Sequence, residues 1–97
     1  MATYVMLVHF TDQGIKNVKK TAQRAEEFKE MAIGHNATVK QIFWTLGHYD
    51  IVIVVEAQDE ITMTALCLSL GALGNVRAQT LHAFSEVEMQ AILRKMA

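Results

Sequence analysis

The chain has 97 residues, 52% of them hydrophobic, and its 9 Lys and Arg against 10 Asp and Glu give a net charge of −1. A chain of this length forms one domain with a single core, and its high apolar content predicts that another copy covers part of its surface. The balanced charge, without a basic cluster, excludes the electrostatic pattern of a nucleic-acid binder. No apolar run reaches the ~20 residues of a membrane span and no secretory leader is recognisable, so we expect a cytoplasmic protein that does not enter the membrane. Cys67 is the single cysteine, which excludes an intrachain disulfide and fits a reducing compartment.

The first third of the chain predicts a strand followed by a helix. Residues 4–10 are β-branched, aromatic or long apolar residues, which favour a strand. Between residues 15 and 31, apolar residues recur at steps of three and four with charged residues between them, which predicts one amphipathic helix of about four turns. Gly34 is expected to end this helix. The apolar positions are Ile15, Val18, Ala22, Ala25, Phe28 and Met31.

Two further strands are predicted over residues 38–45 and 49–56. Gly47 lies between them, and a residue without Cβ tolerates the positive φ of a tight hairpin turn. One face of the second strand is wholly apolar and is expected to pack on the helices. The other face is apolar only in its middle, at Val52 and Val54, which predicts that a second subunit covers it. The helix-packing face consists of Tyr49, Ile51, Ile53 and Val55.

A second helix is predicted to begin after Asp59, whose side chain is a typical N-cap, and to end at Gly74. Its residues are apolar nearly all round, which predicts burial on more than one side. Gly71, one turn before the end, would allow a neighbouring backbone to come close.

Residues 76–82 predict a fourth strand. Ser85 and Glu88 have the spacing of a capping box and open a last helix that contains Ile92 and Leu93. The whole order predicts an α+β fold of the ferredoxin-like βαββαβ type with an extra C-terminal helix, as a single domain over residues 1–97. We expect an antiparallel four-stranded sheet with helices on one face and an oligomer partner on the other.

Four segments, in the same order along the chain, resemble the GYD domain family. The signature segment, residues 45–52, has a Gly-x-Tyr-Asp core at Gly47, Tyr49 and Asp50. The resemblance implies a small α+β domain similar to the dimeric α+β barrel proteins, in which the open sheet faces of two subunits pack together. It implies no particular reaction, so the three core residues are signature positions and not established functional residues. The other segments are residues 11–17, 55–57 and 69–77.

The candidate site lies around the predicted turn, where an indole, an imidazole, a phenol and a carboxylate follow one another closely. These groups could bind a small polar or aromatic molecule or transfer a proton, since an imidazole titrates near pH ~6.5. The structural alternative is that the glycine fixes the turn, the tyrosine packs its ring and the aspartate accepts hydrogen bonds. The residues are Trp44, His48, Tyr49 and Asp50.

His9 and Arg77 complete the candidate set. His9 could approach His82, because the first and fourth strands are neighbours in the ferredoxin-like order. The histidines show no metal-ligand spacing, so no metal and no cofactor are expected. Arg77 could pair with Asp50 or Glu56 across an oligomer interface.

Three hypotheses are consistent with these residues. The first is a non-enzymatic homo-oligomeric module that binds a small ligand near the turn. The second is a cofactor-free isomerase or oxygenase of the dimeric α+β barrel type, with His48 or Asp50 as the base. The third is a purely structural assembly protein, suggested by the apolar second helix. The fold itself does not discriminate among them.

Overall fold

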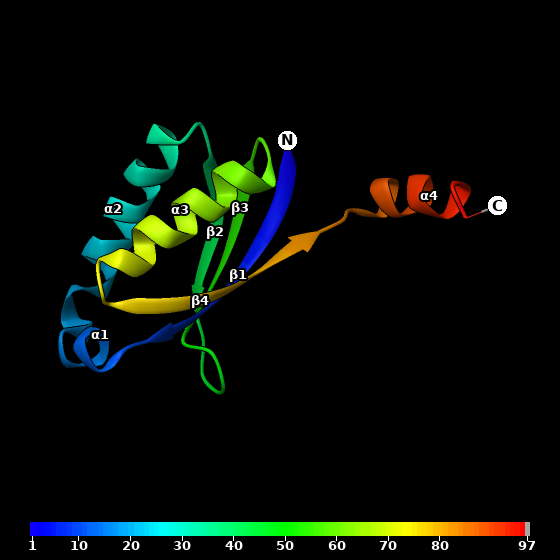
Figure 1. The fold of residues 1–97 in the computed structure, drawn as a ribbon. Helices are drawn as coiled ribbons and strands as arrows, with labels where there is room; N and C mark the ends of the chain where they lie inside the picture. The colour runs from blue at the N-terminus through cyan, green and yellow to red at the C-terminus, as the bar shows by residue number, and fades with distance from the viewer. Residues whose placement is uncertain (97) are drawn as a thin grey trace.

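The computed structural model describes residues 1–96 and contains one four-stranded sheet with the strand order β2-β3-β1-β4 (Figure 1). All neighbouring strands are antiparallel. Helices α2 and α3 lie on one face of the sheet, and α4 lies apart from it. This arrangement confirms the predicted ferredoxin-like α+β fold with an extra C-terminal helix. The elements are β1 (Ala2–Phe10), α1 (Asp12–Lys16), the 3-10 helix η1 (Val18–Lys20), α2 (Thr21–Gly34), β2 (Thr38–Trp44), β3 (Ile51–Ala57), α3 (Glu60–Ala72), β4 (Val76–Ala83) and α4 (Glu86–Arg94).

The core lies between the sheet and the two helices that cover it. Every second residue of β1 and β3 is buried on this side, because side chains alternate between the two faces of a strand. As predicted, Ile51, Ile53 and Val55 belong to this buried face. Met63 and Leu66 contribute the α3 side of the core and are almost inaccessible to solvent.

The predicted first helix is wrong in its continuity, because residues 12–34 form three helical pieces. The backbone leaves the helical conformation at Asn17, with φ −107° and ψ 28°. The Arg24 side chain donates hydrogen bonds to the carbonyl oxygens of Asn17 and Gly14, at 3.0 and 3.2 Å, and so satisfies carbonyls that α1 leaves free. Ile15 and Val18 lie on either side of Asn17 and are exposed, so they take no part in the helix stripe that the periodicity predicted.

The predicted tight turn is a longer loop over residues 45–50. The Thr45 amide closes it with a hydrogen bond to the Asp50 carbonyl at 2.8 Å. Gly47 has φ +118°, which confirms the positive φ expected of it. The prediction that Tyr49 faces the helices was wrong: it precedes β3, and its hydroxyl donates to Gln79 Oε1 at 3.1 Å.

Residues at the boundaries of the later helices start and stop them as predicted. The Asp59 carboxylate accepts a hydrogen bond from the Thr62 amide, and this bond lowers the pKa of Asp59. Ser85 and Glu88 form both hydrogen bonds of a capping box at the start of α4. Gly74 has φ +87°, in agreement with its role as the stop of α3.

Two expectations for α3 were wrong. A Cβ on Gly71 would meet no atom within 4 Å, so no backbone approaches it. Ile61 and Leu68 are exposed in the single chain, so the helix buries one side only. In the described part of the chain no helix combines the length and the apolar character that crossing a membrane requires.

Candidate functional site

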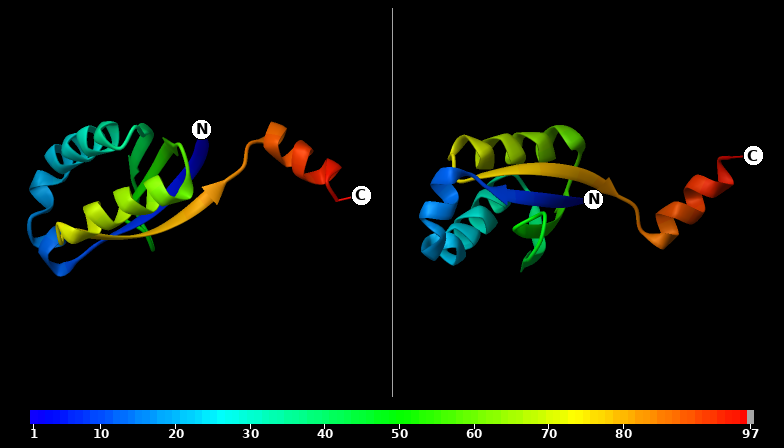
Figure 2. Two further views of the ribbon diagram at one scale, coloured as in Figure 1. Left: turned by 45° about the horizontal axis from the view of Figure 1, so that its top comes forward. Right: turned by 90° about the horizontal axis from the view of Figure 1, so that it is seen from below.

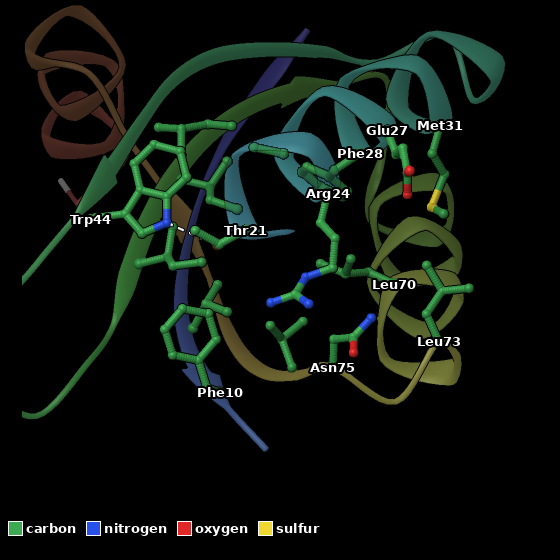
Figure 3. Close-up of a pocket in the computed structure, with 16 residues that line it drawn as sticks. Phe10, Thr21, Arg24, Glu27, Phe28, Met31, Trp44, Leu70, Leu73 and Asn75 are labelled. Carbon is green, nitrogen blue, oxygen red and sulfur yellow. Dashed lines mark hydrogen bonds between the residues drawn. The ribbon is translucent and has the colours of Figure 1, made fainter. Parts of the chain in front are cut away.

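An apolar pocket lies between α2, α3 and the buried face of the sheet (Figure 3). Its volume is about 70 Å³, whereas small-molecule and cofactor sites usually measure ~300–1,000 Å³. The pocket therefore fits one small apolar group and is too small to enclose a cofactor-sized molecule. Its apolar lining includes Val8, Phe10, Phe28, Ile42, Trp44 and Leu70.

Polar side chains stand at the rim of this pocket. The indole nitrogen of Trp44 donates to the Thr21 hydroxyl at 3.0 Å, which ties the end of β2 to the start of α2. The Arg24 guanidinium extends over the pocket in the direction of Asn75 (Figure 3). Because a guanidinium has five N–H donors, Arg24 can hold the Gly14 and Asn17 carbonyls and still offer a donor to a group at the rim.

Three of the predicted site residues form an aromatic cluster at the 45–50 loop. The His9 ring centroid lies 4.7 Å from that of Tyr49 and 5.3 Å from that of His48. The rings of His48 and Tyr49 are 4.9 Å apart and nearly perpendicular. The Tyr49 hydroxyl continues this cluster to Gln79 on β4. We call His9, His48 and Tyr49 the loop cluster.

The other three predicted residues lie elsewhere. The Trp44 ring lines the pocket on the opposite side of the sheet from the loop cluster. The Asp50 carboxylate accepts a hydrogen bond from the Phe10 amide at 2.8 Å, while the Asp50 amide donates to the Val8 carbonyl. Asp50 therefore extends the pairing between β1 and β3, as the structural alternative described. Arg77 is exposed and makes no side-chain hydrogen bond or ion pair with the described residues.

The expectation that His9 and His82 approach each other was wrong. In the β1–β4 ladder His9 lies opposite Arg77, whereas His82 lies opposite Tyr4 near the other end. The two histidines also lie on opposite faces of the sheet. His82 pairs with Tyr4, whose side chain faces the helices, whereas His9 is an odd number of residues from Tyr4 on β1 and faces the other side. Within residues 1–96 no group of three His, Cys, Asp or Glu side chains is placed to hold a metal ion.

A second polar group, on the helix side of β4, was missed by the sequence analysis. His82 Nδ1 lies 3.0 Å from Glu60 Oε1, and the His82 ring is 4.9 Å from that of Tyr4. The Tyr4 hydroxyl is buried and has no hydrogen-bond partner among the described residues. Burial, followed by the charges of Glu60 and Asp59, raises the pKa of Tyr4. No signal in the sequence distinguishes this tyrosine, because its burial depends on α3 lying over β4.

The uncovered face of the sheet carries a continuous apolar surface. Alternation places Val5 and Leu7 of β1 on this face, and in the ladders they lie opposite Val54 and Val52 of β3. The edge strands extend it with Phe43 and Leu81, which are 52% and 43% exposed. No helix of residues 1–96 covers this face (Figure 2). We call the open-face patch the set Val5, Leu7, Phe43, Val52, Val54 and Leu81.

Comparisons with known proteins agree with this architecture. A family model for the GYD domain matches residues 4–93, which confirms the resemblance seen in the sequence. The chain is 33% identical, over 97% of its length and 100% of the relative's, to a "Glutamine synthetase and cystathionine beta-lyase binding protein" of Thermus thermophilus. The crystal structure of TTHA0845, also from Thermus thermophilus, matches 88% of this chain and 95% of its own, with a TM-score of 0.56 and 24% identity, and supports the fold.

Proposed function

The chain belongs to the GYD domain family, and we propose that it is a self-associating module that binds partner enzymes. In this proposal two copies cover each other's open-face patch, and the resulting assembly presents its outer surface to a larger protein. A cytoplasmic location belongs to the proposal, since the free Cys67 fits a reducing compartment.

The observation that carries self-association is the open-face patch. An apolar face in the middle of a four-stranded sheet is costly to leave in water, at ~25 cal/mol for each Å² of apolar surface. The two central strands supply its most enclosed members, Val5, Leu7, Val52 and Val54, which are only half-buried in the single chain. A second copy is the simplest cover, because a two-fold axis brings the same patch against itself. The loop cluster and Arg77 would then lie at the polar rim of this interface.

Protein binding is supported by the relative named above. That protein is described as binding glutamine synthetase and cystathionine beta-lyase, and it aligns with this chain from end to end. We therefore propose the same two classes of enzyme as partners of this chain. The small apolar pocket suits this role, because interfaces often rest on one apolar anchor side chain held in a pocket.

Two measurements test the proposal. Val54→Glu places a charge in the open-face patch and should convert the assembly to monomers in sedimentation equilibrium. Ile33→Glu is the matched control, since Ile33 is 70% exposed on α2 and lies on the helix side. Titration calorimetry with glutamine synthetase from the source organism tests partner binding. An assembly unaffected by Val54→Glu would refute the proposed interface, and no heat of binding at tens of micromolar would refute this partner.

A second candidate function is the binding of a small apolar molecule in the pocket. It is favoured by the position of Trp44, the single tryptophan of the chain, in the pocket lining. Tryptophan fluorescence should therefore change when a small aliphatic or aromatic molecule enters. Ala25→Leu would fill the pocket from α2 and should abolish the change. A fluorescence change that persists in this variant would place binding elsewhere.

A further inference from the structure

The C-terminal helix α4 is separate from the rest of the described chain. All the views in Figures 1 and 2 show it beyond the end of β4, away from α2, α3 and the sheet. No other helix or strand makes extended contact with it. The molecule is consequently elongated, with principal extents of 51, 30 and 18 Å.

One side of α4 is apolar and unpartnered. Met89, Ile92 and Leu93 within the helix, and Met96 in the turn that follows, have the spacing i, i+3, i+4, i+7 of a single stripe. They are 45%, 36%, 52% and 70% exposed, respectively. Val87 is also exposed, at 72%, but the 100° step of a helix places it on the opposite side from this stripe.

α4 is too short to be stable as a helix without a packing partner. α4 has 9 residues, whereas isolated helices shorter than ~12–15 residues are marginal in water. Its capping box nonetheless defines the first turn completely, with Glu88 Oε1 accepting from the Ser85 amide at 2.9 Å. A short helix with a well-formed start and an exposed apolar stripe is typical of a segment that binds another surface.

The connection to β4 directs α4 away from its own core. Only Phe84 and Ser85 separate the end of β4 from the start of α4. The Phe84 ring stacks on His82 at 4.5 Å, and Ser85 is held extended as the cap, with φ −71° and ψ 170°. With this connection the stripe lies away from α2 and α3 of the same chain.

The proposed sheet-face interface also needs more surface than the sheet supplies. Stable interfaces usually involve ~20–30 residues on each side. The four strands have 9, 7, 7 and 8 residues, and only about half of these side chains lie on the open face. β4 carries Leu81 of the open-face patch and is joined to α4 by two residues, so the helix begins at the end of the strand that borders the patch.

We infer that α4 is an exchanged arm: its apolar stripe binds the body of the second copy, and the arm of that copy binds in return. This inference rests on the proposed self-association and names the segment that completes it. The occupant of the stripe is thus another copy of this chain, held by the two-fold symmetry of the dimer.

The test compares two glutamate substitutions in the full chain. Ile92→Glu places a charge on the stripe, and Val87→Glu places the same charge on the opposite side of the same helix. Sedimentation equilibrium should give a dimer dissociation constant at least tenfold higher for Ile92→Glu and within twofold of the wild type for Val87→Glu. Circular dichroism checks that both variants keep the fold. Amide exchange of α4 in the wild type should be slow above the dissociation constant and fast below it.

The outcomes separate the arm from the sheet interface. A dimer that Val54→Glu disrupts and Ile92→Glu leaves unchanged would overturn the arm exchange and keep the proposed function. Fast exchange of the α4 amides in the dimer would also overturn the arm exchange and keep the proposed function. Exchange that slows only when glutamine synthetase is added would overturn it too, and would assign the stripe to the partner enzyme. A wild-type chain that is monomeric at every concentration would overturn both proposals.

Discussion

Gly14→Ala should destabilise the protein far more than any other glycine-to-alanine change within a helix. Gly14 lies in α1, where a Cβ would overlap the backbone carbonyl oxygen of Asn75 in the turn between α3 and β4. The contact joins two segments about 60 residues apart in the sequence, and three hydrogen bonds of 3.0 Å or shorter surround it. They are Thr11 N to Asn75 O at 3.0 Å, Thr11 Oγ1 to Gly74 O at 2.6 Å and Gln13 Nε2 to Asn75 Oδ1 at 2.9 Å.

The expected loss is about 2 kcal/mol of unfolding free energy. Moving α1 away from the turn weakens these hydrogen bonds, each worth ~0.5–1.5 kcal/mol net. Overpacking at a contact that cannot relax costs ~1–3 kcal/mol by itself, so the two estimates agree in size. Alanine has a better helix propensity than glycine, which stabilises the helix by ~0.5–1 kcal/mol. The expected net loss of about 2 kcal/mol already includes this gain.

Urea denaturation at a fixed protein concentration measures this loss, because self-association would make the midpoint depend on concentration. Gly71→Ala is the matched control: it lies inside α3, and no atom is within 4 Å of the added Cβ. The control should be more stable than the wild type by ~0.5–1 kcal/mol. Equal midpoints for Gly14→Ala and wild type would refute the reasoning, since α1 would then be free to move.

Three further changes test the loop and the core. Gly47→Ala should cost about 1 kcal/mol or more, since Gly47 has φ +118°; an unchanged denaturation midpoint would contradict this. Asp50→Ala should cost ~1–2 kcal/mol by leaving the Phe10 amide without its acceptor, and Asp50→Asn should cost less; an unchanged midpoint for Asp50→Ala would show that the amide needs no acceptor. Burial raises the pKa of Tyr4, so its stabilising effect is complete below the unfolded value of ~10 and is lost as the pH rises through the folded value. Denaturation at pH 8 and pH 11 should show that Tyr4→Phe abolishes this alkaline loss of stability. At pH 8 the substitution should change the unfolding free energy by less than ~1 kcal/mol, because the hydroxyl has no partner among the described residues. A larger loss at pH 8 would reveal a hydrogen-bond partner of the hydroxyl.

Signals that act over a few residues were reliable in this sequence. Asp59, Ser85 and Gly74 were predicted to start or stop helices, and each does so through a contact within four residues. The apolar alternation at Ile51, Ile53 and Val55 was equally informative, because burial of one face fixes the register of a strand. These local signals were sufficient to predict the fold.

Features that depend on distant segments could not be predicted. Gly14 and Gly71 both lie within helices, and only the position of the α3–β4 turn makes the first of them necessary. The helical period also continued through Asn17, where the backbone leaves the helical conformation and Arg24 bonds the freed carbonyls.

The candidate site divides for the same reason. Trp44 and Tyr49 are close in sequence, yet their side chains lie on opposite faces of the sheet. Trp44 consequently lines the pocket, whereas Tyr49 joins His9 in the loop cluster. His9 was predicted as a site residue, but its neighbours His48 and Tyr49 became evident only once β1 was known to lie beside the loop.

The most direct test of the account is the mass of the wild-type chain in solution. Multi-angle light scattering on size-exclusion chromatography, from about one to a hundred micromolar, should give at least twice the chain mass of 10.9 kDa at the upper end. The Val54→Glu variant should elute at the single-chain mass in the same run. A folded wild-type chain at 10.9 kDa throughout would show that the open-face patch is stable in water and would contradict the proposed self-association.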